Sequence, residues 1–381
     1  MNIILLCASM EPGRDGVGDY TRRLAANLQN RNHSVLVVAL HDKFLQDISV
    51  LEQDSEGISV PVVRVPATMP AKQRINYLAQ LHQVKQADWV SIQFVNFGFN
   101  KYGLPFELLK LPGVLNAKIK FHIMFHELWC GMGVSSGLKE KVLGQAQKLF
   151  IKAFIYALKP SKIFTSIVRY GRFLNTIGQN AGIVPIYSNI SVNAANETEL
   201  QSFINSGPLA EVIRHQSELL ILGFFGTIYN CPGLWHLLES AGKAAASLNK
   251  KLFVLNIGHN RNSTLLDDVG AKYYYQTGSV SPETINGLMK LVNVGVVTTP
   301  ADSIDKSGTA IAWLERSTPV LIPAADQTYQ PVQKERGIYQ AQTHEDILQA
   351  IQYKAQNRNA DPVTEVADVY LKNFEAANHG K

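Results

Sequence analysis

Short apolar runs rich in β-branched residues alternate with longer helical patterns along most of this chain, which limits the folds open to it. Such alternation is typical of βαβ units, whose parallel strands are buried on both faces of a sheet. The strands expected in the first half are residues 2–8, 33–40, 58–65, 87–95, 118–127 and 161–167. The helices expected between them include 19–30, 72–85 and 138–158. The first half is therefore predicted to be a parallel α/β domain.

The alternation stops between about residues 191 and 217, where the sequence is polar and irregular, and then starts again. The expected elements of the second half are strands 219–226, 251–258, 271–278, 294–300 and 318–323 and helices 233–248, 281–292, 308–316 and 364–376. A single core stops growing at roughly 250–300 residues, and this chain has 381. We expect two Rossmann-like domains, residues 1–195 and 196–360, and a C-terminal helical segment, 361–381, that packs on the first domain. Ligands should bind at the carboxyl ends of the strands, in a cleft that the two domains face.

Charge and cysteine content exclude several classes of function. The 36 Lys and Arg residues exceed the 31 Asp and Glu residues by five, and they are dispersed, so we expect no nucleic-acid partner. Cys7, Cys130 and Cys231 form no CxxC pattern, which argues against a disulfide framework or a structural zinc site. The sequence has no signal-peptide pattern and no run of roughly 18 apolar residues, so we expect a cytoplasmic protein.

A glycine-rich stretch, EPGRDGVGDYTRRLA at residues 11–25, joins the first expected strand to the first expected helix. Such a turn lets backbone N–H groups approach an anion, and the following helix adds the positive end of its dipole. One alternative is a loop that only turns the chain. Another is a nicotinamide-binding GxGxxG turn, in which Thr21 replaces the third glycine and Asp42 stands where a ribose-binding acid would lie.

Six sequence blocks resemble, in the same order, motifs of family-4 glycosyltransferases with the GT-B fold. They are DGVGDYTRRLAANL (15–28), IQFVNFGFNKYGLP (92–105), MFHELW (124–129), VPIYSNI (184–190), TGSVSPETINGLM (277–289) and KSGTAIAWLERSTPVLI (306–322). The resemblance covers most of the chain to about residue 325. It implies transfer of a sugar from a nucleotide-sugar donor, with retention at the anomeric carbon and without a metal or a cofactor. The implied acceptor is a glycan, a lipid-linked saccharide or a small molecule.

The resemblance also implies roles for residues of the first domain. The loop that would meet the acceptor or the donor diphosphate contains Asp15, Gly16, Val17, Gly18 and Tyr20. At the ends of the fourth and fifth expected strands, the acceptor side would include Gln93 and Asn96, and the catalytic pair would be His126 and Glu127. His126 would contact the donor sugar near the transferred carbon, although a lone histidine at a strand end is more often structural.

Donor binding is expected in the second domain. Lys306, Ser307, Gly308 and Thr309 begin a helix after a strand, so their hydroxyl and amide groups could face phosphates. The alternative is an ordinary serine cap with a solvated lysine. The other expected donor-binding residues, whose alternative is simple loop structure, are Gly226, Thr227, Gly258, Ser279, Val280 and Asp305.

The sequence departs from the family pattern at two places, and these departures favour an alternative function. The family has an arginine and a lysine after the first strand of the second domain, where this chain has GTIYNCPG (226–233) without a cation. The positions of the family's paired glutamates hold Ile304 and Ala312, and Asp302, Asp305 or Glu315 would substitute only in a different register. The chain is therefore either an active member of a divergent subgroup or a non-catalytic protein of the same fold that binds or scaffolds. An NAD-dependent oxidoreductase is the second alternative.

Residues 138–164 combine six lysines with an apolar helical pattern that includes Leu149, Phe150, Phe154 and Ile155. A basic amphipathic helix can lie on an anionic membrane, which would suit a lipid-linked acceptor and a peripheral location on the inner face of a membrane. The alternative, which we favour from the sequence, is that the apolar face packs on the sheet while the lysines are solvated.

Overall fold

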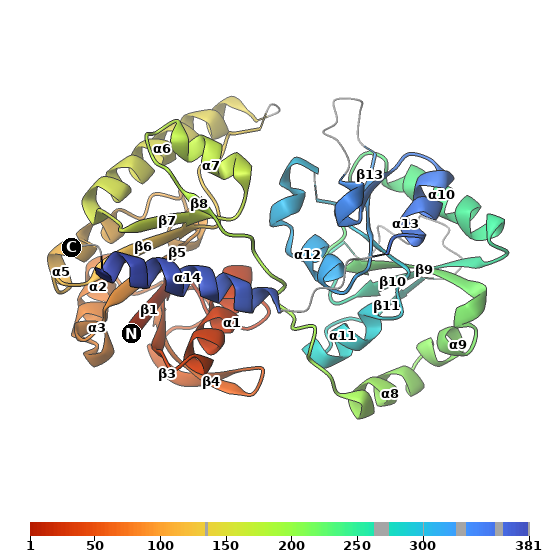
Figure 1. Cartoon of the computed structure of the whole chain (residues 1–381), viewed down its shortest axis with the longest axis horizontal. Coiled ribbons are helices and arrows are strands. Elements are labelled where there is room, and N and C mark those ends of the chain that lie inside the picture. The colour runs from red at the N-terminus through yellow and green to blue at the C-terminus, as the bar shows by residue number, and fades with distance from the viewer. Residues whose placement is uncertain (134–135, 263–273, 300, 325–332, 355–360, 380–381) are drawn as a thin grey trace. The chain divides into compact units, whose positions relative to one another are not determined.

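The computed structural model describes residues 1–133, 136–262, 274–299, 301–324, 333–354 and 361–379. The chain divides into two compact units (Figure 1). Unit 1 contains Met1–Ile186 and Pro362–Lys381, and unit 2 contains Tyr187–Asp361. Each unit is an α/β structure built on one sheet.

The sheet of unit 1 has eight strands in the order β3-β4-β2-β1-β5-β6-β7-β8. The strands are β1 (Asn2–Cys7), β2 (Ser34–Asp42), β3 (Ser49–Ser55), β4 (Ile58–Pro66), β5 (Trp89–Phe94), β6 (Lys120–Phe125), β7 (Lys162–Thr165) and β8 (Gly182–Ile183). The six strands predicted here are all present and pair in parallel. Their apolar runs are long because the strands are buried on both faces.

The strand β3, which was not predicted from the sequence, pairs antiparallel with β4 at the edge of the sheet. In its sequence, SVLEQDS, exposed positions alternate with half-buried or buried ones, and the apolar run of a central strand is lacking. A two-residue turn, Glu56 and Gly57, joins β3 to β4, and both residues have positive φ, 58° and 80°. Turns of this kind match the twist of a hairpin, so local geometry favours the antiparallel pairing.

The helices of unit 1 are α1 (Gly16–Asn30), α2 (Ala71–Gln80), α3 (His82–Lys85), α4 (Asn96–Phe99), η1 (Phe106–Lys110), α5 (Leu111–Val114), α6 (Leu138–Leu158), α7 (Val168–Asn175) and α14 (Pro362–His379). The single helix predicted over 72–85 is instead two, because Leu81 between them has an extended backbone (φ −60°, ψ 129°). In α14, the Phe374 ring stacks on Trp89 of β5 with centroids 4.1 Å apart. The helix lies beside α1, as Figure 1 shows in dark blue, and Asn27 of α1 donates to the Thr364 hydroxyl. The last helix is thus part of unit 1.

Unit 2 has a six-stranded parallel sheet in the order β11-β10-β9-β12-β13-β14. The strands are β9 (Leu219–Phe225), β10 (Lys251–Ile257), β11 (Tyr274–Gln276), β12 (Val294–Val296), β13 (Val320–Pro323) and β14 (Ile338–Ala341). The helices are α8 (Glu197–Asn205), α9 (Leu209–Arg214), η2 (Gln216–Glu218), α10 (Leu234–Ser247), α11 (Pro282–Met289), η5 (Ala301–Lys306), α12 (Gly308–Glu315), η6 (Lys334–Arg336) and α13 (His344–Ile351). Part of the strand expected over 271–278, residues 271–273, lies outside the described residues.

The prediction that residues 191–217 are irregular is wrong, because they contain α8 and α9. Asn196 caps α8 by accepting from the Glu199 amide at 3.1 Å. Ile204 is buried in the core of unit 2, and Leu200 and Phe203 pack against that core. Polar residues surround these few apolar positions, which hid the helical period in the sequence. The β14 strand and α13 were also missed, since a four-residue strand gives a weak pattern.

Trp313 fixes the position of α12 on the sheet. A Cβ atom at Gly223 of β9 would lie 2.7 Å from its ring, and one at Gly295 of β12 would lie 2.5 Å from it. The indole therefore lies against two strands at positions where no other residue leaves room for it. Because Trp313 is fully buried, α12 sits close to the sheet, and the start of α12 is held near the carboxyl end of β12.

We predict that Gly295→Ala lowers the free energy of unfolding of unit 2 by about 1–3 kcal/mol, because the added methyl group displaces the Trp313 ring. Gly242→Ala in α10 is the matched control, since a Cβ atom there would meet nothing within 4 Å and alanine favours a helix. Urea unfolding monitored by tryptophan fluorescence measures both. Equal stability of the two variants would contradict the account of Trp313.

Candidate functional site

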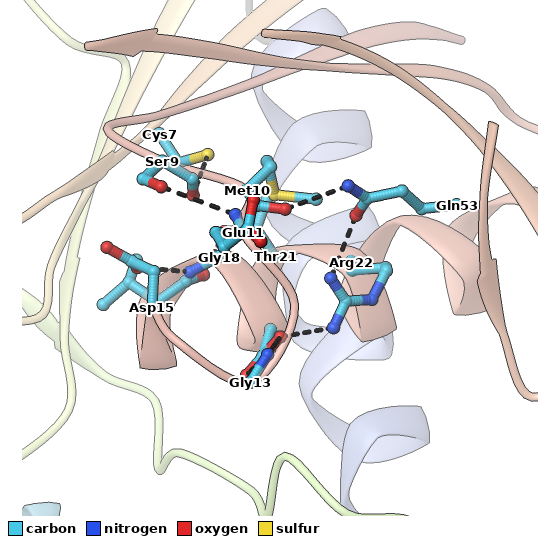
Figure 2. Close-up of polar contacts among 12 residues, drawn as sticks. Cys7, Ser9, Met10, Glu11, Gly13, Asp15, Gly18, Thr21, Arg22 and Gln53 are labelled. Carbon is cyan, nitrogen blue, oxygen red and sulfur yellow. Dashed lines mark hydrogen bonds and ion pairs between the residues drawn. The ribbon is translucent and has the colours of Figure 1, made fainter. Parts of the chain in front are cut away.

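The loop between β1 and α1 is held from several sides (Figure 2). The Cys7 thiol donates to the Ser9 carbonyl at 3.4 Å, and the Met10 amide donates to the Asp42 carboxylate at 3.1 Å. From β3, the Gln53 amide donates to the Met10 carbonyl at 2.9 Å. The loop is therefore positioned by the end of β2 and by β3, the strand that the sequence analysis missed.

Asp42 is the acid that the nicotinamide alternative placed on a ribose. It is fully buried, and it accepts from Arg64 Nε at 2.7 Å and from the Phe44 amide at 3.0 Å as well as from Met10. Burial by itself would raise the pKa of Asp42, but the hydrogen bonds from Arg64 and the two amides outweigh it and lower the pKa. A carboxylate committed in this way is not available to a ribose, so the oxidoreductase alternative is not supported.

The glycine-rich turn already has carboxylates on its amides. Asp15 caps α1 by accepting from the Gly18 amide at 2.8 Å, and the Asp19 carboxylate accepts from the Gly13 amide at 3.2 Å. Asp19 also pairs with Arg22. Burial is the main cause that raises the pKa of both acids. Two amides that an anion would have used are thus occupied by acidic side chains of the chain itself.

Gly18 is required by close packing. A Cβ atom at this position would lie 2.4 Å from the Ser9 carbonyl oxygen. The glycine therefore lets the first turn of α1 press against the loop after β1. Gly16 and Val17 form the start of the same helix, and Thr21 donates its hydroxyl to the Val17 carbonyl at 2.6 Å.

A chain of buried polar side chains crosses β5 and β6. His126 Nε2 donates to Gln93 Oε1 at 3.0 Å, and Gln93 Nε2 donates to Ser91 Oγ at 2.9 Å. Ser91 Oγ lies 2.8 Å from His122 Nδ1. Because the Gln93 oxygen accepts from Nε2, the Nδ1 atom of a neutral His126 carries the lone pair. Gln93 therefore sets the tautomer of His126.

Aromatic groups surround both histidines. The edge of the Tyr20 ring meets His126 with centroids 4.7 Å apart, and Tyr370 of α14 meets His122 at 4.9 Å. Burial lowers the pKa of His126 and of His122 to about 3, and the neighbouring His126 contributes to the shift of His122. Burial also raises the pKa of Tyr370. Both imidazoles are therefore neutral at neutral pH.

Two other residues predicted for the site in unit 1, Asn96 and Glu127, are not part of this chain of hydrogen bonds. Asn96 is buried: its Nδ2 donates to Gln147 Oε1 at 3.0 Å, and its Oδ1 accepts from the Phe97 amide at 2.9 Å. Gln147 also accepts from the Cys130 amide at 2.8 Å. Gln147 of α6 thus joins the loops after β5 and β6 to that helix. Glu127 is half-buried, beside His126 in the sequence.

The buried histidines predict a pH dependence. The folded state keeps His122 neutral down to about pH 3, whereas the unfolded chain takes up the proton as the pH falls below 6.5. The stabilising contribution is therefore complete above that value and is lost as the pH falls toward 3. Between about pH 6 and pH 4, His122→Phe should reduce the slope of unfolding free energy against pH by about 1.4 kcal/mol per unit. Met124→Leu, a change of similar volume at another buried position of β6, removes no ionisable group and should leave the slope unchanged. Chemical unfolding at a series of pH values measures it, and an unchanged slope in His122→Phe would contradict burial of a neutral imidazole.

In unit 2, the carboxyl ends of β9, β10 and β11 are tied together. The Gly226 amide donates to the Ile257 carbonyl at 2.8 Å, and the Gly258 amide donates to the Thr277 hydroxyl at 2.9 Å. Gly226 and Gly258 have φ of 76° and 93°, which only glycine adopts readily. Thr227 is half-buried beside them. The predicted glycine positions therefore fix the shape of the loops.

A hydroxyl cluster lies at the start of α12. Ser307 caps the helix, accepting from the Ala310 amide at 3.4 Å, and its Oγ lies 2.9 Å from the Thr309 hydroxyl and 3.1 Å from the Thr299 hydroxyl. Gly308 is exposed, and a Cβ atom there would meet nothing within 4 Å. Lys306 ends η5 directly before this cap. Ser307, Gly308 and Thr309 are thus brought together, and Thr299 joins them.

The other predicted donor residues, Asp305, Ser279 and Val280, are not part of this hydroxyl cluster. Asp305 forms an ion pair with Arg336 at 2.6 Å. Ser279 is exposed and Val280 is half-buried, directly before the Ser281 cap of α11. The Ser281 hydroxyl donates to Glu199 of α8.

Sequence reasoning missed a second set of polar residues at this end of the sheet. The Asn260 side chain accepts from the Ile228 amide at 3.0 Å, and Asn262 Nδ2 donates to the Ile228 carbonyl at 2.8 Å. Thr298 accepts from the Tyr229 amide at 3.1 Å. These contacts hold the segment GTIYNCPG by its backbone. The asparagines of the stretch HNRN (259–262), directly after a strand, were the signal for such a role.

The residues near the positions where the family has paired glutamates take part in packing and in contacts within unit 2. Ile304 and Ala312 are buried in the core of unit 2. Glu315 accepts from the Ser188 amide at 2.9 Å, and Arg316 donates to the carbonyls of Ile190 and Ser191 at 3.1 Å. Both hold the first segment of unit 2 against α12. The side chain of Asp302 lies outside the described residues.

No protein-family model matches the sequence, and no curated protein is significantly similar to it. Solved structures do match. The chain resembles a UDP-forming α,α-trehalose-phosphate synthase from Burkholderia xenovorans, in complex with glucose-6-phosphate, with a TM-score of 0.58 and 9% identity over 98% of this chain and 100% of that one. The chain has the GT-B fold. It also resembles Anabaena HepE, in complex with UDP and glucose, with a TM-score of 0.53 and 11% identity over 99% of this chain and 97% of that one.

These likenesses confirm the predicted fold, two Rossmann-like parallel-sheet domains, over nearly the whole chain. Membership of family 4 stays a prediction, as do the roles of the site residues. Among the described residues, no group of three histidine, cysteine, aspartate or glutamate side chains could hold a metal ion.

Proposed function

We propose that this protein is a glycosyltransferase that moves a sugar from a nucleotide-sugar donor to an acceptor. The donor binds unit 2 and the acceptor binds unit 1. The observation that carries the proposal is the likeness in fold, over nearly the full length of both chains, to a UDP-forming synthase and to a protein bound to UDP and glucose. The same neighbours favour uridine as the donor base. HepE has also been solved in complex with UDP-glucose.

The start of α12 is the proposed diphosphate site. Lys306, the Ser307 and Thr309 hydroxyls and the Gly308 amide can stabilise the charge that develops on a leaving diphosphate, without a metal. A helix N-terminus adds the positive end of its dipole. The space beside Gly308 supports this role, because the backbone there is open to an approaching phosphate.

The loop after β1 is the proposed acceptor site. Its Gly13 and Gly18 amides already donate to Asp19 and Asp15, so a diphosphate here would meet two carboxylates. A sugar hydroxyl can instead donate to such carboxylates. Of the two roles that the sequence left open for this loop, the charge favours acceptor binding.

His126 is the proposed contact to the reacting sugar. A neutral imidazole with a pKa of about 3 cannot act as an acid near neutral pH, but its Nδ1 lone pair can accept a hydrogen bond from a sugar hydroxyl. Glu127 would lie beside it. We propose transfer with retention, in which the leaving phosphate takes the proton of the acceptor hydroxyl, and a glycan or lipid-linked saccharide as acceptor.

The second candidate is a non-catalytic protein that binds a nucleotide sugar. Two observations favour it: the segment after β9 carries no cation, and Ile304 and Ala312 are buried where the family has glutamates. Release of UDP from UDP-glucose in the presence of candidate sugar acceptors separates the two functions. Turnover establishes the transferase, whereas UDP binding without turnover toward any acceptor supports the binding protein.

Binding of nucleoside diphosphates tests the donor site. A ligand at about 100 times its dissociation constant stabilises the folded state by roughly 2.7 kcal/mol, so UDP should raise the melting temperature while NAD(H) should not. A panel of UDP, GDP, ADP and TDP identifies the base. No shift with any of the four would contradict the proposal.

Variants at the start of α12, each with a matched control, test whether the diphosphate binds there. Lys306→Gln and Ser307→Ala should each weaken UDP binding by about tenfold or more, through loss of a charge or a hydroxyl at the phosphates. The control for charge is Lys290→Gln, at the end of α11, and the control for a lost helix cap is Thr343→Ala, at the start of α13. If either control weakens UDP binding as much as its partner, the start of α12 is not the phosphate site.

A further inference from the structure

The helix α6 has an apolar inner face that explains its packing. Phe150, Ile151, Phe154, Ile155 and Leu158 are buried in the core of unit 1. These include most of the apolar residues that the sequence analysis assigned to packing. Leu149, which was assigned with them, lies elsewhere, because 66% of it is exposed.

The outer side of α6 carries a second apolar stripe. Leu138, Val142, Leu149 and Tyr156 are exposed by 78%, 63%, 66% and 81%. They are spaced by four and seven residues, so at 3.6 residues per turn they fall within an arc of about 40°. We call these four residues the outer stripe. Figure 1 shows α6 along the edge of unit 1. Phe106 of η1, exposed by 58%, contacts Phe150 of the inner face with ring centroids 5.5 Å apart.

Lysines lie along one flank of the outer stripe. At the same helical period, Lys141, Lys148 and Lys152 fall between the stripe and the buried face, and Lys159 follows as the C-cap of the helix. The wider segment is also basic: from Leu128 to Asn196 the sequence contains six lysines, two arginines and one acid, Glu140. Lysine stems can lie along an apolar surface while their ammonium groups reach outward. Apolar and basic groups are therefore combined on one exposed face.

We propose that the outer stripe of α6 docks unit 1 on an anionic lipid surface, with the stripe in the interfacial region and the flanking lysines on the headgroups. Burial of the four apolar side chains supplies part of the attraction, and each lysine near an anionic surface adds to it. Among the described residues, no helix is long and apolar enough to cross a membrane. This surface goes beyond the proposed sugar transfer and does not depend on it.

Charge favours lipid over a second copy of the chain as the occupant. If two copies paired antiparallel through their outer stripes, the lysine flanks would approach each other, with Glu140 as the one acid of the helix to oppose them. Like charges facing across an interface oppose association. An anionic bilayer instead complements the lysines and covers the apolar stripe at the same time.

Co-sedimentation of the full chain with vesicles tests the proposal, without any nucleotide or sugar. The protein should bind vesicles of phosphatidylglycerol and phosphatidylcholine, bind pure phosphatidylcholine at least about tenfold more weakly, and dissociate as salt is raised. The double variant Val142→Gln, Leu149→Gln and the triple variant Lys141→Gln, Lys152→Gln, Lys159→Gln should each lower the partition coefficient at least about tenfold.

Control variants carry the same kinds of substitution elsewhere on unit 1. Val50→Gln replaces an exposed valine of β3, and Lys72→Gln, Lys85→Gln replaces exposed lysines of α2 and α3. Circular dichroism melting shows that each variant is folded. Absence of binding to anionic vesicles, or equal loss in the control variants, would overturn the proposal. So would sedimentation velocity that shows a dimer which Leu149→Gln dissociates, because the stripe would then be covered by a second copy.

Discussion

Burial of parallel strands on both faces is the constraint on which the rest of this structure depends. Strands such as β1 and β5 have no solvent-facing side, so any polar side chain on them must be paired inside the sheet layers or lie at a strand end. Asp42 and Arg64 meet that requirement with an ion pair at the carboxyl ends of β2 and β4. The chain of Ser91, Gln93, His122 and His126 meets it with hydrogen bonds across β5 and β6. The same rule that builds the core therefore positions the candidate site.

The fold could be predicted from the sequence because burial on both faces requires apolar runs that recur along the chain. Long apolar runs located the central strands, and glycines at their ends located the loops. Strands at the edges of the sheets lack such long apolar runs, because β3 is half-exposed and β14 is four residues long. The helix α8 was missed for a related reason, since its polar residues outnumber the apolar ones that face the core, and α9 was missed because it is only six residues long.

The sequence predicted where the candidate site residues lie in the fold, but not which side chains they contact. His126 and Ser307 lie at the strand and helix ends where the sequence places them. What the sequence does not carry is the direction of a side chain. Asn96 faces inward to Gln147, Asp305 pairs with Arg336 and Asp42 pairs with Arg64, and each pairing joins residues at least 22 positions apart. Partners so distant cannot be read from local pattern, and they decide which polar groups are left for a ligand.

The central claim is that unit 2 holds the donor diphosphate at the start of α12, whereas the acidic loop after β1 does not. Hydrogen exchange with mass spectrometry, with and without saturating UDP, tests it most directly. The account predicts slower exchange of the amides of Gly308 and Thr309, with no change for residues 13–18. Protection at residues 13–18 without protection at the start of α12 would contradict it.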